Sequence, residues 1–339
     1  MRFATIADLH LSKYSQDKIE DSTNLPERLS SIKESLYEVA HYCRNNGIKY
    51  IVDAGDTLHN KSIIYATAQN IMLQYFKDFP DLFFVVIDGN HDLSGKGDDV
   101  VSALQALDNL PMVKWVRHDT IYRMDSEGIL FIPYSYNLPK IIKENKSRIL
   151  ISHFGLNEGV LNSGVSVIAD ISLKDLTGRY ELVELGHYHK PQEIINDQIK
   201  LYYVGSLIQL DWGEKGDQKR FLVTDTDTLQ VDSIPISSYK KHIEIEVTTD
   251  NKDEAIKNAN VAKKNGDHVK VILKEKVDIS KEIKDIVIID KTQSDITNRG
   301  ITSSMSQEDR LRKFLEIKEI NEADIYLSVA KEIIDSCEG

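Results

Sequence analysis

Short apolar runs, separated by segments of helical length, recur through the N-terminal part of the chain. The runs lie at residues 3–7, 50–52, 82–87, 129–132, 149–151 and 182–185, and turn residues bound each of them. Among the longer segments, 27–46 repeats apolar side chains at three- and four-residue spacing and is followed by Gly47. Buried strands that alternate with amphipathic helices are typical of an α/β fold whose sheet is covered on both faces.

Polar residues and histidines directly follow five of these predicted strands. The segments are Asp8-Leu9-His10, Gly55-Asp56-Thr57-Leu58-His59, Gly89-Asn90-His91-Asp92, Ser152-His153 and Gly186-His187-Tyr188-His189. They contain six of the ten histidines in the chain. Each segment alone is more typical of an ordinary loop. Because open α/β sheets place ligand sites at the carboxyl ends of their strands, their joint occurrence predicts one shared site.

The five segments supply carboxylate, amide and imidazole donors. No cysteine is among them, and such a set of oxygen and nitrogen ligands suits Mn, Fe or Zn in a hydrolytic site. The donors are too numerous for a single ion. Two ions about 3.5–4 Å apart, bridged by a carboxylate, would use them all, and such two-metal sites serve in-line displacement at phosphorus.

In this order, the five segments resemble the pattern of the calcineurin-like metallophosphoesterases. The resemblance covers residues 1–237 and implies an α/β fold, a two-sheet sandwich flanked by helices, with two divalent metal ions. It assigns the first metal to Asp8, His10, Asp56 and His189, and the second to Asp56, Asn90, His153 and His187. It also implies that His91 donates a proton to the leaving oxygen or stabilises charge on it, and that Asp92 orients the His91 imidazole.

Details of the segments resemble one branch of this family, the SbcD-type DNA-repair nucleases. His59 stands three residues after Asp56, where protein phosphatases of the superfamily carry Asp-Arg-Gly. The later Gly205-Ser206 pair, followed by Glu214, is similar to the end of the nuclease domain in that branch. The resemblance implies a DNA endo/exonuclease that acts on double-stranded ends in repair, recombination and replication. It also implies Mn²⁺ as the metal and a catalytic role for His59.

The same resemblance implies two protein partners. One is a coiled-coil ABC-type ATPase of the SbcC type, held by the C-terminal helices, and the other is a second copy of the chain. Family members dimerise through helices, for which 62–79 and 98–110 are the candidate stretches. Alternatively, the apolar stripe of the first stretch simply packs on the sheet; its members are Ile64, Ala68, Ile71, Met72, Tyr75 and Phe76. The compact length, without a basic tail, resembles subunits encoded by some large bacteriophages.

Beyond residue 237 the sequence pattern changes. Strand-like runs at 242–247, 269–273 and 286–289, with a helical segment at 253–265, predict a small α+β DNA-capping domain over 238–290. Residues 291–305 are polar and aperiodic, as in a linker, and 306–339 contains two short amphipathic helical patterns. These two helices either dock on the chain itself or bind a partner, and the pattern favours neither.

Composition limits the possible functions further. The chain has 339 residues and a formal net charge of -12, and no apolar stretch approaches the roughly 20 residues that cross a bilayer. Two cysteines, Cys43 and Cys337, are too few for a disulfide framework, so we expect a cytoplasmic protein, in the host cytoplasm if a phage encodes it. The acidic balance argues against a broad basic surface that binds DNA by itself.

Two other functions stay open at this point. A phosphodiesterase for small molecules or cyclic nucleotides could use the same ligands, but it needs neither His59 nor the C-terminal helices. A non-catalytic assembly scaffold could keep the fold, but such scaffolds tend to lose ligands, and the ligand positions here are intact.

Overall fold

The computed structural model of the chain describes residues 1–14, 17–95, 99–162, 164, 168–279, 282–292, 305–317, 326, 327 and 329. The chain separates into two compact units. The first contains Met1–Ile243 and Gly266–His268, and the second contains Glu244–Asn265 and Val269–Gly339. The sequence prediction had placed this division earlier, at residue 238.

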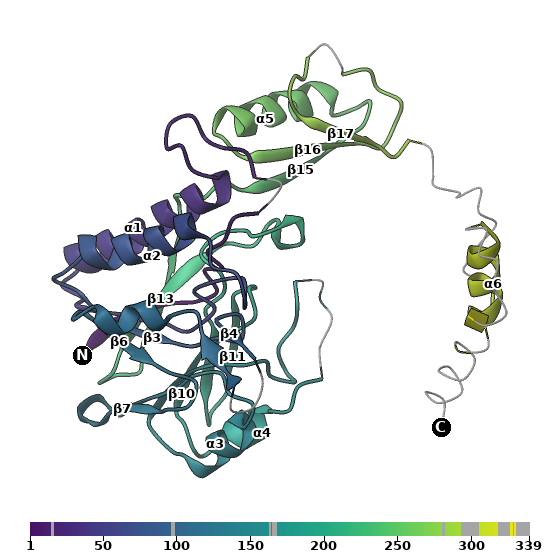
Figure 1. Cartoon of the computed structure of the whole chain (residues 1–339). Helices are drawn as coiled ribbons and strands as arrows, with labels where there is room; N and C mark the ends of the chain where they lie inside the picture. Colours follow the sequence, from purple (N-terminus) through teal and green to yellow (C-terminus); the bar gives the residue numbers. More distant parts are fainter. Residues whose placement is uncertain are drawn as a thin grey trace. The chain divides into compact units, whose positions relative to one another are not determined.

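Two six-stranded sheets form the frame of the first unit (Figure 1). The first sheet has the order β14 (Val231–Pro235), β13 (Arg220–Asp225), β1 (Arg2–Ile6), β2 (Tyr50–Asp53), β3 (Phe83–Ile87) and β6 (Val113–Val116). The second has the order β11 (Gln192–Ile195), β12 (Lys200–Tyr203), β10 (Leu182–Gly186), β9 (Ile149–His153), β8 (Ile129–Ile132) and β7 (Tyr122–Met124). Each sheet contains four adjacent parallel strands: β1, β2, β3 and β6 in the first, and β8, β9, β10 and β12 in the second. Their carboxyl ends therefore gather at one edge of each sheet.

Three apolar layers hold these elements together. Alternate residues of β1 show the arrangement, since Phe3 packs between the two sheets whereas Ala4 and Ile6 face the helices. On the outer face of the first sheet lie α1 (Glu27–Asn45) and α2 (Ala66–Asp78), and on that of the second lie α3 (Leu138–Glu144) and α4 (Leu173–Leu176). The structure confirms the predicted α/β sandwich flanked by helices.

Buried polar side chains also connect the two sheets. Glu184 of β10 is fully buried and accepts hydrogen bonds from Thr5 of β1 and Thr224 of β13. Both oxygens of this carboxyl therefore have partners despite its burial.

Local sequence sets the limits of α1. Pro26 precedes its first residue with an extended backbone (φ -55°, ψ 136°), and it has no N–H that would need a partner. The helix ends before Gly47, whose positive φ of 67° reverses the chain toward β2. The 27–46 prediction therefore agrees with the helix to within one residue.

One predicted helical stretch is wrong. Residues 98–110, expected as a helix that could mediate dimerisation, instead include β5 (Val101–Ser102), which pairs with β4 (Leu93–Ser94), and a 3-10 helix, η2 (Gln105–Asn109). The other stretch does contain α2, but its stripe faces inward, because Ala68, Ile71, Met72, Tyr75 and Phe76 all pack in the core. Ile64 is 44% exposed and precedes the helix. The stripe therefore packs on the sheet and does not form a surface.

The second unit contains α5 (Lys252–Lys264), β17 (Val287–Asp290) and α6 (Gln307–Ile317). Its small sheet has the order β15 (His242–Val247), β16 (His268–Leu273) and β17. Ala255, Ala259 and Ala262 form the buried face of α5. Most of the predicted linker, and most of the second C-terminal helical pattern, lie outside the described residues.

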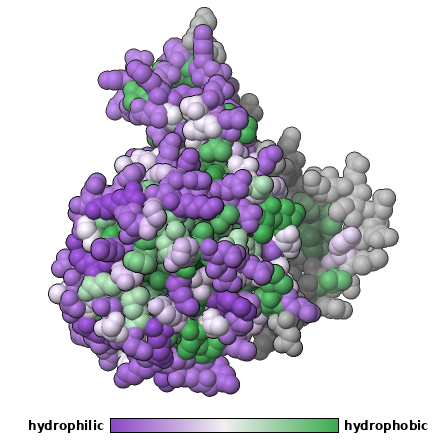
Figure 2. All heavy atoms as spheres, turned by 60° about the vertical axis from the view of Figure 1, so that its left-hand side comes forward, coloured by the Kyte–Doolittle hydropathy of each residue, from purple (hydrophilic) through white to green (hydrophobic). Residues whose placement is uncertain are grey.

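Polar side chains dominate the face of the molecule drawn in Figure 2, with apolar residues in small, scattered groups. Within the described part of the chain, none of the helices combines the length and apolar character that crossing a bilayer demands.

Candidate metal centre

All seven predicted metal ligands lie at the carboxyl ends of β1, β2, β3, β9 and β10. His153 is the last residue of β9, and the other six stand in the loops that follow the other four strands. Four of these side chains are almost fully buried, with exposed fractions of 0% for Asp8, 2% for His10, 2% for Asp56 and 0% for His153. Contacts between the loops join the two sheets at this edge. The backbone N–H of His187, which follows β10, donates to Asp8 Oδ1 and Oδ2 at 2.9 and 3.1 Å.

The ligands predicted for the first metal lie together. The Nε2 atoms of His10 and His189 face each other at 3.0 Å, and His10 Nε2 lies 3.6 Å from Asp56 Oδ2. Asp8, His10 and His189 each offer one ligand atom within 4.8 Å of the other two. Two imidazole nitrogens that point at each other beside carboxylates form a donor set that fits a divalent cation.

The ligands predicted for the second metal adjoin this group through Asp56. His153 Nε2 lies 3.3 Å from Asp56 Oδ2 and 3.1 Å from Asn90 Oδ1. His187 Nδ1 lies 3.0 Å from the same Asn90 oxygen. Asp56 is thus shared by both groups, at the place that a bridging carboxylate would take.

Burial and neighbouring charges set the protonation of these groups. Burial lowers the pKa of His187 to about 4, and lowers that of His10 well below its usual value, so both rings are neutral at pH 7 and can act as ligands. Burial also lowers the pKa of His153, but the Asp56 and Asp8 carboxylates outweigh it and raise this pKa to about 9. Burial would raise the pKa of Asp56, yet the field of His153 and its hydrogen bond lower it, so Asp56 is ionised.

Four of the candidate ligand residues have backbone conformations that non-glycine residues rarely adopt. The φ angles of Asp8, His10, Asp56 and His187 are positive, at 53°, 48°, 57° and 98°. Such residues cost on the order of 1–3 kcal/mol each and occur mainly at functional sites. A cluster of four at this edge indicates that the surrounding fold fixes the ligands in place.

Gly89 lets two of the loops pass close together. A Cβ atom at this position would lie 2.2 Å from the backbone nitrogen and Oδ1 of Asp56. Any side chain there would collide with the shared carboxylate, so the close approach of the loops after β2 and β3 requires glycine.

His59 and His91 lie beside the ligands and are only partly buried. Their rings stack with centroids 5.2 Å apart, and His59 Nδ1 lies 3.2 Å from His10 Nδ1. The backbone N–H of His91 donates to Asp56 Oδ1 at 2.7 Å, which places its side chain next to the shared carboxylate. The structure thus brings both predicted catalytic histidines to the ligand cluster.

Asp92 occupies a different position from the one predicted. Its carboxylate accepts hydrogen bonds from the backbone N–H groups of Leu58, Gly89 and Thr57 at 2.8, 2.9 and 3.3 Å. The His91 imidazole is oriented instead by its Nδ1, which lies 2.8 Å from the carbonyl oxygen of His59. Asp92 therefore ties the loop after β2 to the loop after β3, and the predicted contact with the His91 ring is wrong.

Comparison with known proteins agrees with this arrangement. Residues 1–224 match the family model of the calcineurin-like phosphoesterases. The chain belongs to the calcineurin-like phosphoesterase family. Among curated proteins, this phosphoesterase is similar to exonuclease subunit 1 of Enterobacteria phage T4, with 25% identity over 249 residues that span 69% of this chain and 68% of the relative.

Two solved structures are also similar to this phosphoesterase. A structure reported as a novel archaeal phosphodiesterase covers 70% of this chain and is matched over 100% of its own, with 12% identity and a TM-score of 0.37. The nuclease MPE of Pseudomonas putida covers 68% of this chain and is matched over 87% of its own, with 14% identity and a TM-score of 0.33.

Two residues beside the candidate ligands could not be predicted from the sequence. Glu214 Oε1 lies 2.8 Å from His189 Nδ1, and the Tyr14 hydroxyl donates to the carbonyl oxygen of His10 at 3.1 Å. The Arg28 guanidinium covers the Tyr14 ring at 3.8 Å. Glu214 stands in the segment that resembles the nuclease branch. Its contact with His189 could not be predicted, because it joins residues that are distant in the sequence and meet only in the folded chain.

Proposed function

We propose that this phosphoesterase is a Mn²⁺-dependent DNA endo/exonuclease that acts on double-stranded ends as the nuclease subunit of a repair and recombination complex. The observation that carries the proposal is the shared position of Asp56 between two groups of ligands, with His59 and His91 at their side. This constellation suits hydrolysis of a phosphodiester.

The residues divide into three roles. Asp8, His10, Asp56 and His189 would hold one divalent cation, and Asp56, Asn90, His153 and His187 would hold the other. When bound, two such cations lower the pKa of water and offset the charge that develops on the phosphate. His91 is held at Nδ1 by the His59 carbonyl, which leaves Nε2 as the atom that donates a proton to the leaving oxygen.

DNA as the substrate is supported by the curated relative, whose name describes it as an exonuclease subunit. The word subunit also supports assembly with other chains. We propose that residues 306–339 bind a coiled-coil ATPase of the SbcC type, that residues 238–290 cap the DNA, and that two copies of the chain pair. In α6, Phe314 is 42% exposed, which supports a partner-binding role for that helix.

The test is a comparison of substrates with the purified full chain. With Mn²⁺, we expect cleavage of linear duplex DNA and little hydrolysis of cyclic nucleotides. Intact DNA together with rapid hydrolysis of a cyclic nucleotide would instead support the small-molecule phosphodiesterase. Inactivity toward both, with Mn²⁺ bound and the ATPase subunit present, would support the scaffold.

A further inference from the structure

A buried pair of opposite charges lies directly behind one of the predicted metal ligands. Glu214 is 2% exposed, and Lys219 is 0% exposed. The Lys219 Nζ atom lies 2.7 Å from Glu214 Oε2. Burying two charges costs desolvation free energy unless well-placed hydrogen bonds offset it. A pair this deeply buried therefore suggests a specific structural role.

Both oxygens of Glu214 have defined partners. Oε1 lies 2.8 Å from His189 Nδ1, and Oε2 accepts hydrogen bonds from Ser206 Oγ and the backbone N–H of Leu210, each at 3.1 Å. Lys219 Nζ donates in addition to the carbonyl oxygen of His189 at 3.0 Å and to Ser206 Oγ at 3.0 Å. Lys219 and Ser206 together fix which oxygen of Glu214 faces the imidazole.

The Gly205-Ser206 turn brings these groups within reach. Gly205 has a φ of 81°, and a Cβ atom there would lie 2.8 Å from the carbonyl oxygen of His189. Ser206 forms a parallel bridge with Ala7, the residue before Asp8. The turn therefore rests against two of the ligand loops at once.

We propose that Glu214, held by Lys219 and Ser206, is a positioning residue for the first metal, which keeps the His189 proton on Nδ1 and points Nε2 toward the metal position. A carboxylate can only accept a hydrogen bond, so the Nδ1 atom next to it must be the donor. The lone pair of Nε2 then faces His10 Nε2, 3.0 Å away. Partners of this kind behind a histidine ligand typically contribute about 10–100-fold to metal affinity. The inference rests on the proposed ligand set, but its readout is metal binding and not DNA cleavage.

Two double variants separate positioning from simple packing. Glu214→Met with Lys219→Met removes the acceptor, and Glu214→Gln with Lys219→Met keeps one, while both lack buried charge at these positions. With the full chain and Mn²⁺ in calorimetry, we expect two sites in the wild type. The methionine variant should lose about 10–100-fold in affinity at one site only, and the glutamine variant should lose less than tenfold.

The outcomes that overturn the proposal are equally specific. Wild-type affinity at both sites in the folded methionine variant would do so, and so would equal losses in the two double variants. Glu193→Gln is the control, because Glu193 pairs with Arg220 at 2.6 Å and touches no ligand; it should bind Mn²⁺ as the wild type does.

A measurement on the unaltered protein covers the case in which the variants do not fold. Nitrogen-15 correlation spectra of the histidine side chains in the full chain should show a proton on Nδ1 of His189. A His189 ring whose Nδ1 lacks a proton would contradict the proposal, whether or not the protein cleaves DNA.

Discussion

Gly89 shows how strongly single residues constrain this site. An alanine there would bring Cβ to 2.2 Å from the backbone and carboxylate of Asp56, so the loops after β2 and β3 would have to separate. We expect Gly89→Ala to lower the free energy of unfolding by about 1–3 kcal/mol and to weaken Mn²⁺ binding. Thermal unfolding and calorimetry measure both effects.

The matched control for this variant is Gly178→Ala. Gly178 has a φ of 77° but no neighbour within 4 Å of an added Cβ, so it should lose only the roughly 1 kcal/mol of a left-handed alanine and retain Mn²⁺ binding. Equal Mn²⁺ affinity in the two variants would contradict the steric account of Gly89.

We propose that His91 donates a proton to the leaving oxygen. His91→Ala should leave Mn²⁺ affinity nearly unchanged and lower the cleavage rate by about 10²–10⁴-fold, the usual contribution of a general acid. Single-turnover assays with Mn²⁺ measure this loss. His41→Ala is the control, since His41 is exposed on α1, and it should cleave normally. Unchanged DNA cleavage by the His91→Ala variant would show that His91 is not the general acid.

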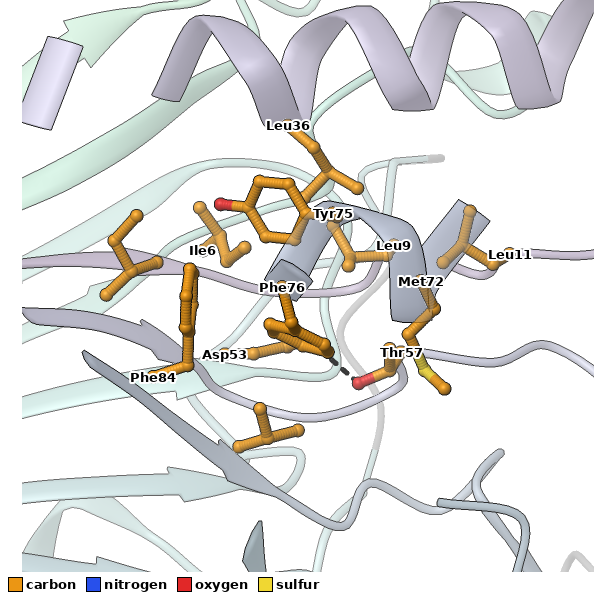
Figure 3. Close-up of a pocket in the computed structure, with 12 residues that line it drawn as sticks. Ile6, Leu9, Leu11, Leu36, Asp53, Thr57, Met72, Tyr75, Phe76 and Phe84 are labelled. Atoms are coloured by element: carbon orange, nitrogen blue, oxygen red, sulfur yellow. Dashed lines mark hydrogen bonds between the residues drawn. The ribbon is translucent and has the colours of Figure 1, made fainter. Parts of the chain in front are cut away.

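Asp53 is a buried carboxyl that does not belong to the ligand set. Figure 3 shows it among apolar side chains of the core, including Leu36, Tyr75 and Phe76, where it accepts a hydrogen bond from Thr57. Burial raises the pKa of Asp53 to about 7, although hydrogen bonds from Thr57 and the Gly55 N–H oppose this. The folded state therefore keeps a proton that the unfolded chain loses near pH 4.

This shift predicts how stability depends on pH. Between pH 4 and 7 the folded state binds more protons at Asp53 than the unfolded state, so its contribution to the free energy of unfolding falls as pH rises. Asp53→Asn removes that contribution. In metal-free protein, the stability of the variant relative to the wild type should increase by a few kcal/mol from pH 4 to 7 and then level off. A difference that is constant over this range would contradict the pKa.

Among the elements, the strands of the two sheet centres were predictable and the peripheral ones were not. The runs at 129–132 and 182–185 match β8 and β10 closely, because strands buried on both faces consist mainly of apolar residues, with Glu184 of β10 as the exception. In contrast, β14 and β11 contain no buried residue and give no such signal. The helix prediction for 98–110 was wrong because the apolar residues of this stretch belong to a short β-hairpin and a 3-10 helix.

The same limits apply to the site. The five segments could be selected from the sequence because each stands at the end of a predicted strand, and the structure brings their seven candidate ligands together. The partner of Asp92 and the role of Glu214 depend on contacts between loops distant in sequence, such as that of Leu58 with Asp92, which no local pattern reports.

The inward orientation of α2 can be tested through its stripe. Met72 is 1% exposed in the core, so Met72→Ala should lower the free energy of unfolding by about 2–5 kcal/mol without changing the oligomeric state. Ile64→Ala, at a residue 44% exposed, should change stability by less than about 0.5 kcal/mol. Chemical denaturation with light scattering measures both. A dimer lost in stable, folded Met72→Ala would place the stripe at an interface instead.

For the whole molecule, net charge limits how the proposed nuclease could bind DNA. Residues 241–339 carry a net charge of -4 and residues 1–240 a net charge of -8, so the acidic excess is not confined to one tail. Two divalent cations above Asp8 and Asp56 would invert the local field that a phosphate meets. Most of the remaining binding free energy for DNA would then come from a partner protein.

Weak binding by the isolated chain follows from this distribution. At physiological salt and with Ca²⁺ in place of Mn²⁺, fluorescence anisotropy should give a Kd for duplex DNA no tighter than about 10⁻⁶ M. Binding should tighten when the proposed ATPase partner is added. A nanomolar Kd for the chain alone would contradict this prediction, because it would require a basic DNA-binding surface on the chain itself.

We propose that the two groups of candidate ligands hold two metal ions that share Asp56. Anomalous diffraction from crystals grown with Mn²⁺ would locate these ions. We expect two peaks about 3.5–4 Å apart, one beside His10 and His189 and one beside His153 and His187, with the Asp56 carboxylate between them. A single peak, or a pair that Asp56 does not bridge, would contradict it.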